Sequence, residues 1–303
     1  MAVVHKQPVL LMLERSVKQA FPDENRYSLA RWRPVDVDDL IRLGRPEDGG
    51  YVISRRCVDT SNVLFSFGIS EDWSFDKAFC HLNPQVMVVG VDGSISDKVF
   101  SSRARDCINK AMLAIVQFQA RMAVTECRVA AYWWKKAVQF RRFYDGRSRR
   151  FHKLFLGANR DASAITWRDL WRIEPLLVTA KGDHPTCFVK MDIEGSEYEV
   201  LPALLLDTNK ISGLTIEFHD CHIHWGRFSM VMDELCKCFV VVHVHGNNFK
   251  PLIPGSTTPQ ALEISFVNRR LLPDHLREVT AQYPRPDLDK PCNPEKPDYP
   301  IYF

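Results

Sequence analysis

Residues 188–201 have the sequence FVKMDIEGSEYEVL, which predicts a buried strand that ends at Asp192, a tight turn through Glu194, and then a helix. The first turn of this helix is acidic, which suits the positive end of the helix dipole. Because Asp192 and Glu194 directly follow a strand, we expect their carboxylates to point into a cleft, where they can hold an amino group, bind a metal ion or move protons. The alternative is that these acidic residues only cap the helix.

Other short runs rich in Val, Ile and Phe recur along the chain, with helical segments between them. The runs are residues 63–67, 86–91, 151–156, 214–218, 239–244 and 262–267, and the helical segments are residues 72–82, 165–173, 197–206 and 229–238. Near-continuous apolar strands are typical of parallel sheets that are covered by helices on both faces. The alternation therefore predicts an α/β layered domain, in which ligands bind beyond the carboxyl ends of the strands.

Three segments lie outside this alternation. Residues 1–50 are predicted to be an N-terminal helical extension of a domain that spans residues 51–280. Residues 97–150 are predicted to be a helical insert within that domain. Residues 281–303 contain six prolines, which predicts an extended tail over the surface.

The composition excludes several classes of protein. The chain has 303 residues, of which 46% are apolar and 25% charged, values that argue against disordered, collagen-like and coiled-coil classes. Its nine cysteines include no C-x-x-C pair, so we expect free thiols in a reducing compartment. No apolar stretch reaches the ~20 residues that a bilayer span needs. We therefore expect a cytoplasmic protein without a transmembrane segment.

The segment after the first predicted strand indicates a nucleotide-type ligand. At Gly68, in the sequence FSFGISED (residues 65–72), the backbone can approach a ligand closely, and the helix that follows favours anionic groups. A complete G-x-G-x-x-G motif is missing, which argues against ordinary NAD or FAD binding. Asp92 ends the next strand 24 positions later, where an acidic residue can accept hydrogen bonds from ribose hydroxyls. A plain turn at each position is the alternative.

These motifs together resemble one family. The string KMDIEGSEYEVL, residues 190–201, is similar to the hallmark of the FkbM-type family of S-adenosylmethionine-dependent methyltransferases. Supporting segments follow the same order, namely RLGRPEDGGYVI (42–53), FGISEDWSF (67–75), VDGS (91–94), HVHGNN (243–248) and the proline-rich tail. The cofactor turn departs from the family pattern, because it holds one glycine where the family has several.

The resemblance implies a Rossmann-like seven-strand methyltransferase sheet, mostly parallel with the last strand antiparallel. It implies methyl transfer from S-adenosylmethionine to a hydroxyl of a small-molecule or sugar-like, glycosidic acceptor. Carried over by position, the cofactor-binding residues are Gly68, Glu71 and Asp72 at the methionine moiety, Asp92 at the ribose, Gly157 and Ala158 beside the adenine, and Asp192 beside the sulfonium.

Five of the ten histidines fall between residues 219 and 245. One interpretation is that His219 or His245 acts as a general base on the acceptor hydroxyl. A second is a divalent cation with Asp192 and Asp220 among its ligands. A third is that these histidines only line a polar cleft or satisfy buried backbone groups. The candidate catalytic residues are therefore Asp192, Glu194, His219 and His245, and the ligands of a metal ion stay unassigned.

The formal net charge of +3 conceals an uneven distribution. Residues 121–153 hold ten Lys and Arg against two acidic residues, together with several aromatics, so the rest of the chain carries −5. This composition suits a cationic helix pair packed by its aromatics, a lid over an anionic or sugar-like acceptor, or a surface for a membrane or, less favoured, for nucleic acid. The alternative to a methyltransferase is thus a non-catalytic module of the same fold that contacts nucleic acid or an anionic surface through this insert.

Overall fold

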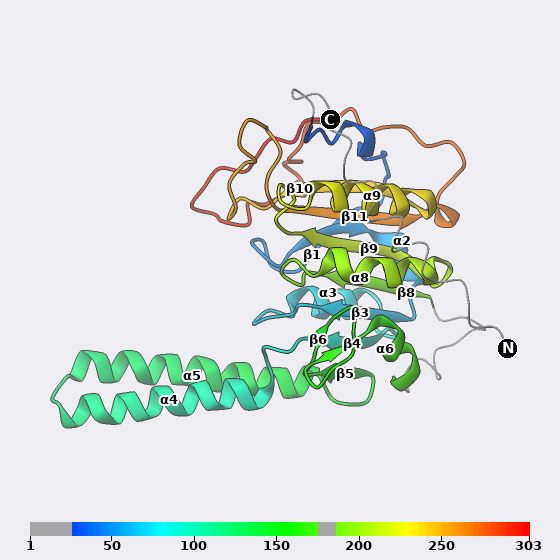
Figure 1. Ribbon diagram of the computed structural model, residues 1–303. Helices are drawn as coiled ribbons and strands as arrows, with labels where there is room; N and C mark the ends of the chain where they lie inside the picture. The colour runs from blue at the N-terminus through cyan, green and yellow to red at the C-terminus, as the bar shows by residue number, and fades with distance from the viewer. Residues whose placement is uncertain (1–25, 175–185) are drawn as a thin grey trace.

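The computed structural model describes residues 26–174 and 186–303, and a seven-stranded sheet lies at its centre (Figure 1). The strand order is β10-β11-β9-β8-β3-β4-β5. These strands are β3 (Val63–Phe67), β4 (Met87–Val91), β5 (Arg149–His152), β8 (Cys187–Met191), β9 (Ile211–Phe218), β10 (Phe239–Gly246) and β11 (Leu262–Asn268). Neighbouring strands are parallel except where β11 pairs with β10 and β9. The predicted sheet, with an antiparallel last strand, is confirmed.

The order of the sheet reverses between β3 and β8. The strands β4 and β5 are added on one side of β3, whereas β8 and β9 follow on the other side. In open α/β sheets, the crevice that binds a ligand forms at this switch point, outside the carboxyl ends of the strands. Since Phe67 pairs with Met191 at the ends of the two strands, the switch point lies at Gly68 and Asp192.

Helices cover both faces of the sheet. They are α2 (Arg55–Thr60), α3 (Ser74–Leu82), α6 (Trp167–Ile173), α8 (Glu197–Leu204) and α9 (Trp225–Cys238), with short 3-10 helices η3 (Leu205–Lys210) and η4 (Arg269–Leu271). Side chains of a strand alternate between faces. Accordingly, Phe65 packs into the apolar core that contains Leu201 of α8 and Phe228 of α9, while Leu64 packs into the core that contains Phe79 of α3.

Two predicted segments differ from the structure. The third apolar run is divided, because residues 149–152 join the sheet as β5 whereas Phe155–Leu156 (β6) pairs with Ala164–Ile165 (β7) in a separate sheet. The described part of residues 1–50 contains the 3-10 helix η2 (Ala30–Trp32) and strand β1 (Leu40–Leu43), which pairs with β2 (Tyr51–Ser54), in place of the predicted helical extension. Residues 1–25 lie outside the described residues.

The insert forms a helical hairpin that projects from the body (Figure 1). Its helices are α4 (Asp97–Val116) and α5 (Ala120–Phe143). Alanines fill the seam between the two helices, and those that are buried are Ala104, Ala111, Ala114, Ala123, Ala130 and Ala137. At the base, Phe140 packs edge to face against Trp73, which fixes the hairpin to the body. None of the described helices is long and apolar enough to cross a bilayer.

The proline-rich tail lies against β10. Residues 281–303 form no helix or strand, apart from an isolated bridge between Tyr283 and Ile301. Asp289, Cys292 and Ile301 of the tail are buried, so this segment completes the edge of the sheet.

Candidate active site

A glycine turn after β3 packs closely against the end of β8. Gly68 has a φ of 66°, and a Cβ atom at this position would lie 1.4 Å from the carbonyl oxygen of Asp192. Only glycine fits this position without displacing the backbone. The Nζ of Lys190 donates to the carbonyl oxygen of Gly68 at 2.6 Å, which ties the turn to β8.

Two hollows open on either side of this turn and share Gly68, Ser70 and Asp192. The insert-side hollow has a volume of about 240 Å³ and is also lined by Arg45, Asp48, Glu71, Asp72, Tyr132 and Lys136. The β6-side hollow has a volume of about 290 Å³ and is also lined by Asp92, Ser94, Phe155, Leu156, Ile193 and Glu194. Because the hollows meet at the carboxyl end of β3, an elongated ligand can occupy both.

Asp92 holds the glycine turn in place. Its Oδ2 accepts the backbone N–H groups of Ile69 at 2.8 Å and Ser70 at 2.7 Å. Its Oδ1 accepts the backbone N–H of Ser94 at 2.7 Å and the Ser94 hydroxyl at 2.6 Å. A carboxylate offers about four lone-pair sites. Donors of the protein itself therefore occupy both oxygens of Asp92, which were predicted to accept hydrogen bonds from ribose hydroxyls.

The other predicted cofactor residues divide into two groups. Glu71 and Asp72 line the insert-side hollow, where Glu71 pairs with Arg103 of α4 and Asp72 accepts the Ser74 hydroxyl at 2.7 Å. Gly157 and Ala158 are not among the residues that line either hollow.

Phe155 and Leu156, which directly precede Gly157 and Ala158, line the β6-side hollow. Phe155 lies against Gly93, where an added Cβ would be 2.5 Å from its ring, and 55% of its surface is exposed. The sequence does not reveal these two residues, because the apolar run that contains them predicts one continuous strand of the main sheet.

A row of ionisable side chains crosses the carboxyl edge of the sheet, and we call it the carboxylate row. In the antiparallel register, Glu263 of β11 lies directly opposite both His245 of β10 and Glu217 of β9. Asp192 continues the row after β8. The carboxylate of Asp48 joins it, since oxygens of Asp48, Glu217 and Glu263 all lie within 4.8 Å of one another. Like charges directly opposite each other destabilise a sheet, so the acidities of these groups are expected to be shifted.

Burial and crowding shift the acidities in this row. Burial and the charges of Asp192 and Glu263 raise the pKa of Glu217 well above its usual range. Burial and Glu263 also raise the pKa of Asp48. Perturbed carboxyl groups beside a cleft are typical of functional sites. Glu217 and Glu263 each stand as a single acidic residue inside an apolar run, and this is the signal by which the sequence could have revealed them.

His219 lies at the centre of four carboxylates. Its Nδ1 is 3.0 Å from Glu197, and its Nε2 is 3.5 Å from both Glu217 and Glu194 and 3.8 Å from Asp192. Burial alone would lower the pKa of His219, but the hydrogen bond to Glu197 and the surrounding negative charges raise it to about 9. The ring is therefore an imidazolium at neutral pH, a form that cannot accept a proton from a hydroxyl.

His245 lies apart from both hollows and is buried. Its Nδ1 is 2.9 Å from Glu263, and its Nε2 is 2.9 Å from Asp298 of the tail. Burial opposes protonation, but the bonds to Asp298, Cys292 and Glu263 raise the pKa of His245 well above 6.5. With both ring nitrogens engaged, His245 is not placed to act as the general base that the sequence suggested.

Asp192 is the predicted catalytic residue that the structure places best. It lines both hollows, and its Oδ2 accepts the hydroxyl of Tyr51 at 3.0 Å and lies 3.7 Å from the Nζ of Lys190. Glu194 also reaches the β6-side hollow, from a position with a φ of 54° and with 84% of its side chain exposed. The structure therefore brings Asp192, Glu194 and His219 together and leaves His245 at the far end of the row.

Comparisons with known proteins give only distant similarity. No protein-family model matches the chain, and no curated protein matches it. Among solved structures, precorrin-6y C5,15-methyltransferase from Geobacter metallireducens is 7% identical, with a TM-score of 0.32, and the match covers 70% of this chain and 86% of that one. Two structures of 16S rRNA (adenine(1408)-N(1))-methyltransferase from Catenulisporales acidiphilia are 13% identical, with TM-scores of 0.28 and 0.26. Those two matches cover 75% and 74% of this chain, and 97% and 98% of the other chains. Scores this low neither define a family nor transfer an activity.

Proposed function

We propose that this protein is an S-adenosylmethionine-dependent methyltransferase that acts on a hydroxyl of a small-molecule or sugar-like acceptor. The observation that carries the proposal is the pair of joined hollows at the β3–β8 switch point, with Asp192 at their junction. An elongated ligand with two chemically different ends suits two hollows with different linings.

The linings match the two ends of S-adenosylmethionine. The insert-side hollow offers the carboxylates of Asp48 and Asp72 for an ammonium group and the cations Arg45 and Lys136 for a carboxylate, which suits an amino acid moiety. The β6-side hollow offers the apolar surfaces of Phe155, Leu156 and Ile193, which suit an adenine ring. Asp192, which is common to both, would face the sulfonium charge.

The residues of this chain would mainly position the acceptor and receive its proton. S-adenosylmethionine supplies an activated methyl group when bound, so in-line placement is the main requirement. We assign proton acceptance to Asp192, because it reaches both hollows and Tyr51 orients its carboxylate. His219, which lies within 4 Å of Asp192 and Glu217, would help to hold these side chains in place. Tyr132 and Lys136 of α5, which line the insert-side hollow, would close over the amino acid moiety bound there.

Calorimetric titration of the full chain with S-adenosylmethionine tests the proposal directly. We expect saturable binding. Asp192→Asn should bind the cofactor almost as tightly in the same titration, but it should transfer less methyl group to the acceptor in a screen of metabolite extracts. Folded wild-type protein that binds no cofactor would contradict the proposal. If such protein instead gave a salt-dependent shift with nucleic acid, the result would support the alternative of a non-catalytic binding module.

A further inference from the structure

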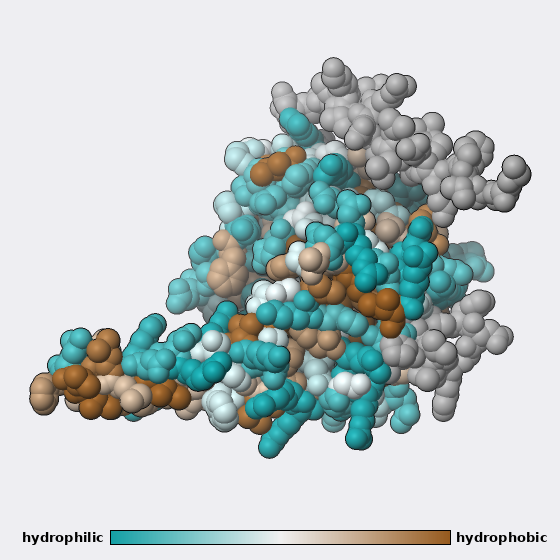
Figure 2. Space-filling model, turned by 60° about the horizontal axis from the view of Figure 1, so that its bottom comes forward, coloured by the Kyte–Doolittle hydropathy of each residue, from teal (hydrophilic) through white to brown (hydrophobic). Residues whose placement is uncertain are grey.

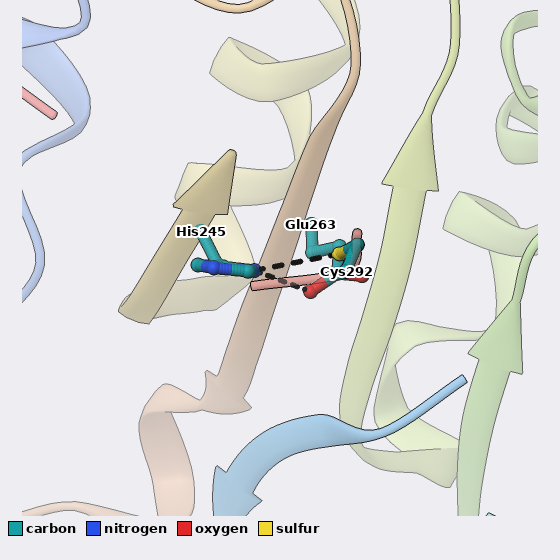
Figure 3. A group of neighbouring side chains, drawn as sticks. All are labelled: His245, Glu263 and Cys292. Carbon is teal, nitrogen blue, oxygen red and sulfur yellow. Dashed lines mark hydrogen bonds and ion pairs between the residues drawn. The ribbon is translucent and has the colours of Figure 1, made fainter. Parts of the chain in front are cut away.

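Three side chains with different ligand atoms meet where the tail crosses the sheet (Figure 3). They come from separate elements, with His245 on β10, Glu263 on β11 and Cys292 in the tail. The Nδ1 of His245 is 2.9 Å from a carboxylate oxygen of Glu263 and 3.9 Å from the Sγ of Cys292. The Sγ is 3.4 Å from the other oxygen of Glu263. All three residues are buried.

We propose that these residues bind a zinc ion. Zinc bonds of roughly 2.0–2.3 Å in a tetrahedron place neighbouring ligand atoms about 3.3–3.6 Å apart. The observed separations, which involve both oxygens of Glu263, lie around this range, so a rotation of this carboxylate and shifts of a few tenths of an ångström would seat the ion. One sulfur, one imidazole nitrogen and one carboxylate oxygen form a donor set that favours zinc over magnesium or calcium, which prefer oxygen ligands only. The fourth position would be left to a water molecule.

Asp298 provides the outer support that a zinc-binding histidine normally has. Its carboxylate lies 2.9 Å from the Nε2 of His245, the ring nitrogen that faces away from Glu263. A carboxylate on the second nitrogen fixes the ring orientation and raises the basicity of the ligating nitrogen. Asp298 belongs to the same tail as Cys292, so one ion would attach this segment to β10 and β11.

The hydrogen bonds of the metal-free group also fit the site. Without metal, His245 and the thiol of Cys292 both lie within hydrogen-bond distance of Glu263. Zinc binding would replace these bonds and would release the thiol proton of Cys292. The alternative is that these three residues form a hydrogen-bond network without a metal ion, and the experiment must distinguish this network from a zinc site.

Metal content and cobalt spectroscopy of the full chain test the site. We expect about one zinc per chain after dialysis against metal-free buffer. We also expect that Co²⁺ added to the stripped protein gives the near-ultraviolet band of thiolate-to-cobalt charge transfer. Cys292→Ser should abolish the band, whereas Cys127→Ser, at an exposed cysteine of α5, should retain it.

Two results would overturn the zinc site. One is folded wild-type protein that holds no zinc and gives no thiolate–cobalt band, a measurement that stands even if Cys292→Ser fails to fold. The other is an unchanged band in folded Cys292→Ser. Neither measurement uses cofactor or acceptor, so failure of the zinc site and failure of the proposed methyltransferase activity are distinguishable.

A separate observation concerns the end of the hairpin, where large apolar side chains gather at the surface (Figure 2). We call this region the hairpin tip, and its exposed apolar residues are Ile108, Met112, Leu113, Ile115, Val116, Phe118, Met122 and Val124. Phe118 is 97% exposed and Val116 73%. The inward positions are filled by Ala111 and Ala114, so the outward surface of the last turn of α4 is apolar throughout.

We infer that the hairpin tip inserts into the surface of an anionic lipid bilayer. A partner protein would contact one apolar side of the hairpin. Apolar residues on all outward sides of the last turn of α4 suit insertion among lipid acyl chains. Basic residues lie among and beside the apolar residues of the tip, with Lys110 on α4 and Arg121 and Arg128 on α5, and these suit anionic headgroups. Shallow insertion of this kind needs no helix that spans the bilayer.

Vesicle sedimentation tests the hairpin tip. We expect the full chain to sediment with vesicles of phosphatidylcholine and phosphatidylserine, and at least tenfold less with phosphatidylcholine alone. The double substitution I115S/F118S should abolish sedimentation, whereas Ile223→Ser, which changes an equally exposed apolar residue of the body, should not. No sedimentation of the wild type would overturn the inference. So would a dimer in light scattering that the double substitution dissociates, because the occupant of the tip would then be a second copy of the chain.

Discussion

Gly68 lets the ends of β3 and β8 touch, and the free energy of unfolding should depend on this contact. We predict that Gly68→Ala lowers that free energy by about 3 kcal/mol, because the added Cβ overlaps the carbonyl of Asp192 and forces backbone strain. Urea denaturation measures the change. Gly226→Ala is the matched control, since no atom lies within 4 Å of its added Cβ. An equal effect of the two substitutions would contradict the prediction.

Asp92 should affect cofactor binding through the loop that it holds. We predict that Asp92→Ala weakens S-adenosylmethionine binding at least tenfold in calorimetry, because the turn at Ile69 and Ser70 loses its acceptor. Hydrogen exchange at these two amides should rise even without ligand, which a role limited to ribose contact would not produce. Asp106→Ala, at an exposed site on α4, should change neither quantity.

His219 should make stability depend on pH. Its pKa rises from 6.5 in the unfolded chain to about 9 in the folded protein, so the imidazolium contributes its full stabilisation below pH 6.5 and loses it as the pH rises through 9. The contribution is on the order of 3 kcal/mol. Urea denaturation at several pH values should show this loss in the wild type and in His81→Gln, an exposed control on α3. The loss should be smaller in His219→Gln, and an identical profile would rule this role out.

At the scale of elements, the hairpin depends on its alanine seam. We predict that Ala130→Leu destabilises the hairpin by about 1–3 kcal/mol, because a larger side chain forces α4 and α5 apart. Ala131→Leu changes an exposed neighbour on the same helix and should have almost no effect. Helix content against temperature, measured by circular dichroism, compares the two. If both variants lost the same thermal stability, helix propensity would explain the loss and packing in the seam would not.

The elements of the sheet were predictable from sequence because buried strands are continuous apolar runs. The break inside residues 151–156 was not predictable. The apolar run continues through Leu154, although the chain leaves the main sheet there and pairs in a separate two-stranded sheet. Strand β1 in the N-terminal region was also missed, since its partially buried residues alternate weakly and it pairs only with β2.

The site was predictable only where its residues follow strands directly. Gly68, Asp92 and Asp192 could be placed at the switch point on that basis. The opposition of Glu217 and Glu263 depends on the register between β9 and β11, which are far apart in sequence. Contacts between distant segments also explain why the sequence suggests His219 or His245 as a general base. The carboxylates that stabilise their protonated rings include Glu197 of α8 for His219, and Glu263 of β11 and Asp298 of the tail for His245.

At the scale of the whole molecule, the tail is part of the fold. Asp289 lies 3.1 Å from the Nε2 of His243, and Asp298 lies 2.9 Å from that of His245, so two buried histidines of β10 each contact a carboxylate of the tail. We predict that a chain truncated after Arg285 loses several kcal/mol of stability, since breaking a buried ion pair costs about 3–5 kcal/mol. Thermal denaturation measures the loss, and Asp287→Asn, at an exposed tail position, is the control. A truncated chain that melts with the full-length protein would show that the tail is dispensable.

The hairpin enters and leaves the body between β4 and β5, and its far end contacts nothing else among the described residues. Each helical turn added to both α4 and α5 would carry the tip about 5.4 Å further from the body without altering the register of the sheet. The reach of the molecule would therefore change through insertions or deletions at this end that leave the residues of the candidate site in place.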